Sequence, residues 1–180
     1  MKVVGDGSGY DSHLDVLNVV LGICKPKTAI EFGMGKFSTP TLLMYCNFTV
    51  SVEMQSEAWY DEVVRYCKLN GICRGWFPIR HITDNGNIDI FGIFDGAFEF
   101  SFVDGHGKTR PDCVNACMNA SVPTIVAHDT ETNWYRWDKV NGVGYRHFRY
   151  SPKRPFTDVY TKNNDIISSS EFFSIVKEVQ

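Results

Sequence analysis

Acidic residues recur where short apolar runs end in this sequence. Glu31, Glu53, Asp84, Asp104 and Asp129 each stand at or beside the end of such a run. If the runs are parallel strands, their carboxyl ends meet at one edge of a sheet, where open α/β sheets bind ligands. Like charges gathered there repel one another and do not favour folding. The pattern therefore predicts a site for a cationic or hydroxyl-rich ligand, or for a metal ion.

The stretch IEFGMGKFST (residues 30–39) places Gly33 and Gly35 directly behind an apolar run. Glycine permits a tight turn and lets a ligand come close to the backbone. A dinucleotide would lay its pyrophosphate over such a turn, and the carboxylate of Glu31 would repel that anion. S-adenosylmethionine carries an ammonium and a sulfonium group and no phosphate, so it fits better. Ser38 stands where a dinucleotide loop has its third glycine.

Two further carboxylates are spaced to suit a nucleoside. Glu53 lies 22 residues after Glu31, and an acidic residue at about this spacing binds the ribose hydroxyls in nucleotide-binding proteins. Asp84 follows the third apolar run and could accept a hydrogen bond from the adenine amino group. In TDNGN it is equally suited to forming a turn.

Hydrophobic periodicity and capping signals predict the elements that hold these residues. Helices are expected at 14–25, 38–46, 56–71 and 110–121, and strands at 28–33, 48–54, 76–83, 99–105 and 123–130. Residues 84–96 are turn-rich. Alternating strands and helices imply a mostly parallel α/β sheet with helices on both faces.

The pattern changes after residue 130. Strand-like runs at 145–150 and 157–162 have no helical stretch between them, which predicts an antiparallel hairpin that finishes the sheet. Residues 168–179 are expected to form a terminal helix, with Ser168 and Glu171 spaced as a capping box.

Composition sets the broad class. The chain has 180 residues, 43% of them hydrophobic, and a net charge of −3, which suits one globular domain and gives no basic field for nucleic acid. No apolar run is long enough to span a membrane or to act as a secretory signal. Six cysteines without a C-x-x-C pair favour reduced thiols in the cytoplasm. The basic residues of 136–154 are interpreted as a solvated face.

AIEFGMGKFST, Glu53 in SVEM, and FVDGHGKTRPD…IVAHDT resemble the class I S-adenosylmethionine-dependent methyltransferases. The last motif is similar to that of the small-molecule O-methyltransferase branch, with VDG-H…HD. The resemblance covers residues 28–130. It implies a Rossmann-like fold, S-adenosylmethionine as cofactor, and methyl transfer to a small-molecule acceptor, with a hydroxyl favoured. Within a single domain of residues 1–180, helix 14–25 would precede the cofactor-binding core, and a hairpin and helix at 145–179 would follow it.

The resemblance also suggests catalytic residues. In catechol-type O-methyltransferases, an aspartate after the fourth strand and an acidic pair after the fifth bind magnesium. Asp104 and Asp129 match the first and last of these ligands. His128 stands at the remaining position, where its nitrogen suits manganese or iron better than magnesium. His128 could instead be a general base, with a pKa near 6.5. Lys108 lies one position from the family's catalytic lysine.

Other assignments stay open at this point. Asp104 and His106 stand beside the expected cofactor, and His106 could contact cofactor or substrate or lie at the edge of the site. Trp134, Tyr135 and Trp137 could form an acceptor wall or lid, or could pack a loop onto the sheet. The alternatives to an active methyltransferase are an S-adenosylmethionine-binding module without catalytic activity and a nicotinamide-dependent oxidoreductase. A nucleic-acid methyltransferase is disfavoured because no Asp/Asn-Pro-Pro-aromatic motif follows the fourth strand.

Overall fold

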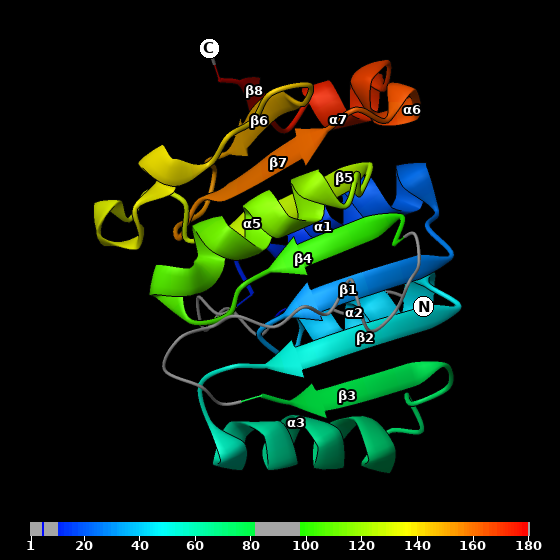
Figure 1. The fold of residues 1–180 in the computed structure, drawn as a ribbon. Helices are drawn as coiled ribbons and strands as arrows, with labels where there is room; N and C mark the ends of the chain where they lie inside the picture. The colour runs from blue at the N-terminus through cyan, green and yellow to red at the C-terminus, as the bar shows by residue number, and fades with distance from the viewer. Residues whose placement is uncertain (1–4, 6–10, 82–97, 180) are drawn as a thin grey trace.

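The computed structural model describes residue 5 and residues 11–81 and 98–179. The described strands form one eight-stranded sheet in the order β3-β2-β1-β4-β5-β7-β6-β8 (Figure 1). Their bounds are β1 (Thr28–Phe32), β2 (Phe48–Glu53), β3 (Trp76–Arg80), β4 (Phe100–Val103), β5 (Thr124–His128), β6 (Arg146–Tyr150), β7 (Thr157–Thr161) and β8 (Lys177–Glu178). Strands β1 to β5 run parallel to one another. Strand β7 runs antiparallel to both β5 and β6, and β8 runs antiparallel to β6.

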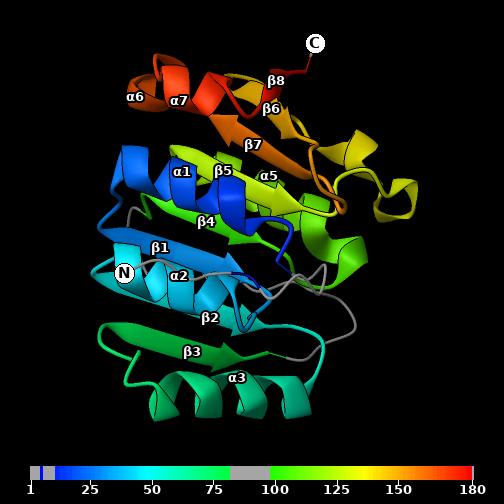
Figure 2. The same ribbon diagram turned by 180° about the vertical axis from the view of Figure 1, so that it is seen from behind.

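Helices cover both faces of the sheet. The described helices are α1 (Leu14–Cys24), α2 (Ser38–Tyr45), α3 (Glu57–Leu69), α5 (Arg110–Asn119), α6 (Asn164–Ile167) and α7 (Ser170–Phe173). Helix α5 lies on the face towards the viewer in Figure 1, and α1 and α2 lie on the opposite face, which Figure 2 shows from the front. The two large clusters of buried apolar side chains lie one on each side of the central strands. The sheet is therefore the middle of three layers.

The predicted alternation of strands and helices is confirmed, and so is the antiparallel hairpin at the end of the sheet. The element ends shift by one to three residues, as helix ends and strand ends commonly do. The turn-rich stretch 84–96 lies outside the described residues.

The predicted terminal helix at 168–179 is wrong. The chain forms two short helices, α6 and α7, and then the two-residue strand β8. The cap of α7 is Ser169, whose hydroxyl accepts the Phe172 amide N–H at 3.2 Å. The ring of Phe172 packs edge-on against Phe148 of β6, with ring centroids 5.1 Å apart. This packing and the pairing of β8 with β6 replace the continued helix that local propensity predicted.

Charged residues of 136–154 are mostly paired, as a solvated face would be. Arg136, Arg146, Arg149 and Lys153 form ion pairs with Asp138, Glu178, Asp158 and Asp15 respectively. Among the described residues, no helix combines the length and the apolar character that crossing a bilayer requires.

Candidate functional site

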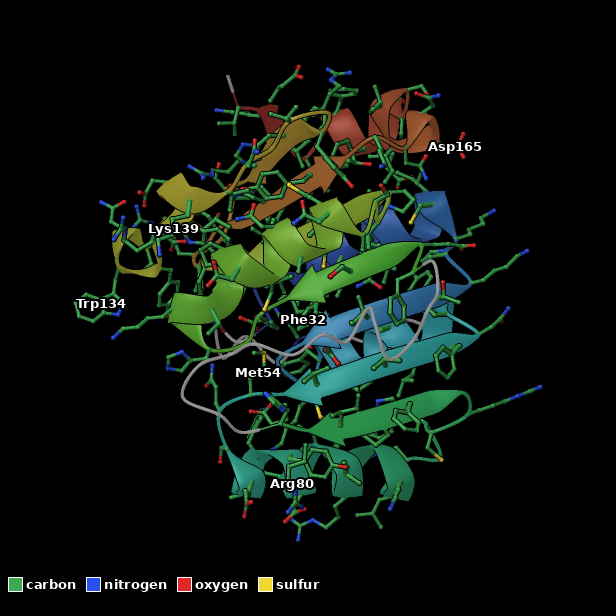
Figure 3. All side chains as sticks on the ribbon, viewed as in Figure 1. Phe32, Met54, Arg80, Trp134, Lys139 and Asp165 are labelled. Carbon is green, nitrogen blue, oxygen red and sulfur yellow. The ribbon has the colours of Figure 1, made fainter. Side chains whose placement is uncertain are left out.

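A cavity of about 850 Å³ opens at the carboxyl ends of β1, β2, β4 and β5. Phe32 and Met54, labelled in Figure 3, mark the ends of β1 and β2 beside it. The lining residues are His13, Gly33, Met34, Gly35, Lys36, Phe37, Ser38, Glu53, Gln55, Ser56, Trp59, Asp104, Arg110, His128, Asp129 and Pro155. The cavity has the size and position of ligand sites in open α/β sheets.

The turn after β1 requires glycine at position 33. Gly33 has a φ of +89°, and a Cβ there would lie 2.4 Å from the backbone nitrogen of Gly105. Its own amide N–H donates to the carbonyl of Val52 at 2.7 Å. The turn is therefore pressed between the ends of β2 and β4, at a distance that no side chain permits. Gly35 is similarly close to the Ser38 hydroxyl, which would lie 2.6 Å from an added Cβ.

Glu53, at the end of β2, lines the cavity and organises its floor. Its carboxylate accepts the backbone N–H groups of Met34 at 3.1 Å, Gln55 at 2.8 Å and Ser56 at 3.1 Å. A carboxylate has about four acceptor positions. The described partners occupy three of them, so the side chain can still accept a hydrogen bond from a ligand hydroxyl.

Glu31 is fully buried beneath the turn and does not line the cavity. One of its oxygens accepts the hydroxyl of Thr39 at 2.8 Å. Burial raises the pKa of Glu31 to about 7, and hydrogen bonds from Ser38, Ser51 and Thr39 oppose that rise. The observed position suits a carboxyl group that braces the turn against helix α2.

Arg110 forms ion pairs with both of the aspartates that were expected to bind a metal ion. Its guanidinium lies 2.9 Å from the carboxylate of Asp104 and 2.6 Å from that of Asp129. It also donates to the backbone carbonyls of Gly105 and His128, at 2.8 and 2.9 Å. Arg110 is 5% exposed, so a buried cation at the start of α5 ties the ends of β4 and β5 together. Burial raises the pKa of Asp104, and Arg110 opposes the rise.

His13 and His128 lie beside this ion pair, with ring centroids 4.9 Å apart. His13 immediately precedes α1 and is 3% exposed. Neither of its ring nitrogens has a hydrogen-bond partner among the described residues. An unpaired buried polar group costs about 1–3 kcal/mol. Burial, and to a smaller extent the nearby His128, lower the pKa of His13 to about 3.

The structure corrects the pKa expected for His128. Burial lowers it to about 4, with a smaller contribution from Arg110, so the ring is neutral at pH 7. The ring nitrogen Nδ1 lies 3.0 Å from the hydroxyl of Thr157, and Nε2 lies 3.4 Å from that of Ser12. A neutral imidazole can accept a proton or ligate a metal, but the low pKa makes it a weaker base than expected.

The predicted metal ligands Asp104, His128 and Asp129 are not the set that converges best. The side chains whose ligand atoms lie within 4.8 Å of one another are His13, Asp104 and His128. Asp129 is held by Arg110 instead. His13 takes the place that the sequence had suggested for Asp129.

Most of the predicted site residues meet at the cavity. Those that line it are Gly33, Gly35, Ser38, Glu53, Asp104, His128 and Asp129. Three others do not line it: Glu31 is buried beneath the turn, while His106 and Lys108 are exposed beyond β4. Asp84 lies outside the described residues.

Sequence reasoning missed His13, Arg110 and Trp59. The indole N–H of Trp59 donates to the carbonyl of Met34 at 2.6 Å, which places the ring beside the glycine turn. Trp59 sits one turn into the helix that follows Glu53, and this position is the signal that could have identified it. His13 offers no such signal, because it stands far from the recognised motifs in the sequence.

The three aromatic residues after β5 do not line the cavity. Trp134 is 69% exposed and points outward in Figure 3, and the ammonium group of Lys108 lies over its ring at 5.4 Å. The guanidinium of Arg110 lies over the ring of Tyr135 at 4.8 Å, and the indole N–H of Trp137 donates to the Asp129 carbonyl at 3.1 Å. Tyr135 and Trp137 therefore pack this loop onto the site.

The strand order, the antiparallel β7 and the glycine turn at the end of β1 together define the fold of the class I S-adenosylmethionine-dependent methyltransferases. The sequence matches no known family and no curated protein. Solved structures do match the fold. An O-methyltransferase from Bacillus cereus in complex with S-adenosylhomocysteine aligns with a TM-score of 0.63 and 16% identity, over 89% of this chain and 83% of that one.

Two further structures show the breadth of this fold. The O-methyltransferase TomG of Streptomyces achromogenes, involved in tomaymycin synthesis and solved with S-adenosylmethionine, has a TM-score of 0.60, 14% identity and coverage of 89% and 82%. A Streptococcus pneumoniae protein proposed to be a tRNA (m1A22) methyltransferase has a TM-score of 0.55, 9% identity and coverage of 88% and 69%. The fold therefore carries acceptors of very different size, and the site must decide the function.

Proposed function

We propose that this protein is a single-domain, S-adenosylmethionine-dependent methyltransferase that methylates a hydroxyl group of a small molecule. The observation that carries the proposal is the placement of the glycine turn, Glu53 and the Asp104–His128 group around one cavity. The first two suit a nucleoside, and the third suits an acceptor that must lose a proton.

The cofactor would bind along the ends of β1 and β2. Gly33 and Gly35 let its methionine portion approach the backbone, with Ser38 at the start of α2 beside them. The remaining acceptor capacity of Glu53 suits a ribose hydroxyl, and the ring of Trp59 provides an apolar wall for the base. Asp84 and His106 stay proposals for contacts with the adenine and with the outer edge of the site.

The fit of the cofactor rests on this chain's own geometry. Gly33 keeps the turn close against the Asp104–Gly105 backbone, and the backbone of Gly33 and Gly35 lines the cavity, where a ligand can approach it. The carboxyl groups of Glu53 and Asp104 line the same cavity and favour a positively charged ligand over a phosphate. Glu31 lies deeper, so its contribution would be to hold the turn.

Methyl transfer asks the protein to align the acceptor and to take one proton. The methyl group on a sulfonium is already activated, which is the chemistry that the cofactor supplies. Asp104 and His128 both line the cavity, and we propose that the acceptor hydroxyl binds beside them. Either side chain could receive the proton, and Lys108 and Asp129 are proposed to adjust the field around them.

Several observations favour a small hydroxyl acceptor over the alternatives. The cavity is lined by residues from four strand ends, and the basic residues of 136–154 are largely paired with acids. Negative charge near the glycine turn disfavours a nicotinamide dinucleotide. The free thiols suit a cytoplasmic location, which we also propose. A nucleic-acid acceptor and a binding module without activity are outcomes that the assay below separates.

Calorimetry with S-adenosylmethionine and S-adenosylhomocysteine tests the cofactor. We expect Glu53→Gln to weaken binding about 10- to 100-fold, because hydrogen bonds to a charged group contribute about 1.5–3 kcal/mol. Glu57→Gln is the matched control, because Glu57 is 70% exposed on α3. Binding of NAD with no binding of the methyl donor would contradict the proposal.

Turnover is tested by release of S-adenosylhomocysteine across phenols, sugars, short peptides and tRNA. Release with a small hydroxyl compound supports the proposal. Release with RNA alone would refute the acceptor class, and cofactor binding without any release would indicate a binding module.

A further inference from the structure

We propose that His13, Asp104 and His128 form a binding site for a divalent transition-metal ion at the inner wall of the cavity. This set differs from the ligands that the sequence resemblance suggested, because it includes a histidine from the segment before α1 and leaves out Asp129. The site itself stands on geometry alone. Its role in catalysis rests on the proposed methyltransferase function.

The ligand atoms of the three side chains converge on one point in the fold. Each of the three residues offers a ligand atom, and all three atoms lie within 4.8 Å of one another. Bonds of about 2.0–2.2 Å to one ion would bring such atoms to within roughly 3.5 Å of one another. Binding one ion would therefore bring these atoms closer by at most about 1.3 Å. The three residues come from separate parts of the chain, so the fold rather than local sequence brings them together.

The ring of His13 lacks hydrogen bonds among the described residues. Both ring nitrogens are buried, and neither has a hydrogen-bond partner among the described residues. Buried polar side chains are nearly always paired. The ring lies against Phe102 on one side and His128 on another, and it lines the cavity. A metal ion would provide the partner that the described part of the protein does not.

The ring of His128 is held by a neighbouring hydroxyl group. Its Nδ1 lies 3.0 Å from the hydroxyl of Thr157, which can fix the ring, and its Nε2 has a longer contact of 3.4 Å with the Ser12 hydroxyl, which an ion could replace. Histidines that bind metals typically use the second nitrogen for such a bond. Arg110 similarly holds the carboxylate of Asp104 in place.

The charge around the three residues also suits a cation. Asp104 and Asp129 share the single guanidinium of Arg110, so the cluster keeps a net negative charge. Asp11 is also near enough to act on the ring of His13. A divalent cation would be attracted to this surrounding despite the neighbouring arginine.

The donor set indicates the class of metal. Two imidazoles and one carboxylate suit zinc, iron or cobalt, whereas magnesium prefers oxygen ligands. Three protein ligands leave coordination positions open, as in catalytic sites. Because His13, Asp104 and His128 all line the cavity, an ion held by them would be within reach of an acceptor, and the chemistry it would supply is a lower pKa for the acceptor hydroxyl.

Cobalt(II) alone is the probe, because its visible absorption reports the ligands. The metal-free protein, prepared by chelation and without S-adenosylmethionine, is titrated with cobalt and then with zinc in competition. We expect one equivalent to bind, excess magnesium to leave it in place, and His13→Phe and His128→Gln each to weaken binding at least 10-fold. His147→Gln is the control, because that histidine bonds Asp158 between β6 and β7, away from the cavity.

His13→Phe also separates metal binding from packing. The change removes two unpaired polar atoms and keeps a ring against Phe102, so the metal-free protein should unfold at the same temperature or a higher one. Equal cobalt affinity in wild type and His13→Phe, or no binding by wild type at millimolar cobalt, would overturn the proposal. A protein that binds cobalt but not S-adenosylmethionine would leave the site standing and refute the methyltransferase function instead.

Discussion

The buried carboxyl group of Glu31 makes a quantitative prediction about stability. Its pKa is raised from 4.5 to about 7, chiefly by burial. In the unfolded chain the carboxyl ionises at its ordinary value, so the folded state holds a proton that the unfolded state has lost between those two pH values. The stabilisation is therefore complete below pH 4.5 and is lost as the pH rises through 7.

The magnitude follows from the two pKa values. One pKa unit corresponds to about 1.4 kcal/mol, so a difference of about 2.5 corresponds to about 3.5 kcal/mol over the whole titration. Glu31→Gln cannot ionise and keeps a side-chain oxygen for the Thr39 hydroxyl. We expect the stability of the variant relative to the wild type to increase by about 3 kcal/mol between pH 5 and pH 8.5.

Urea unfolding between pH 5 and 8.5, followed by tryptophan fluorescence, measures this difference. Glu57→Gln, on the exposed face of α3, should give a curve parallel to that of the wild type. If Glu31→Gln also gives a parallel curve, the carboxyl is not desolvated in the way the structure indicates, and the reasoning fails.

Three further changes test other parts of the site. Gly33→Ala should destabilise the fold by at least about 1–3 kcal/mol in urea unfolding and abolish cofactor binding in calorimetry, because φ is +89° and the Cβ meets the Gly105 backbone; wild-type behaviour would show that the turn has room. Arg110→Met should cost about 3–5 kcal/mol in the same unfolding assay by leaving two aspartates unpaired, and a loss below 1 kcal/mol would contradict a buried ion pair. Cys73→Ser should remove the fast phase of thiol labelling in the folded protein, because Cys73 is the exposed cysteine; an unchanged fast phase would place another thiol at the surface.

The sequence predicted the parts of the site that follow from strand ends. A parallel sheet places the carboxyl ends of its strands at one edge, so Glu53, Asp104 and His128 could be assigned to one cavity before the structure was known. Gly33 was predictable for a similar reason, because a turn that must pass close to another backbone excludes a side chain. These predictions depend on rules that act locally along the chain.

The residues and elements that the sequence did not predict correctly are determined by tertiary packing. Nothing around His13 in the sequence indicates that the start of α1 reaches the ends of β4 and β5. Arg110 stands at the start of α5, where solvent exposure is the usual expectation, and only the fold shows that it enters the site. At the C-terminus, the pairing of β8 with β6 and the burial of Phe172 override a stretch with helical capping signals.

The position of β7 between β5 and β6 constrains how the protein is made. Strand β6 is synthesised first, yet its neighbour in the sheet is β7, which comes later in the chain. While a ribosome is still producing residues before 157, β5 is therefore paired with β4 on one side only, and β6 has no strand to join. The chain from β6 onwards can join the sheet only after β7 has been made, and a chain interrupted there would leave the edge of β5 open to association with other molecules.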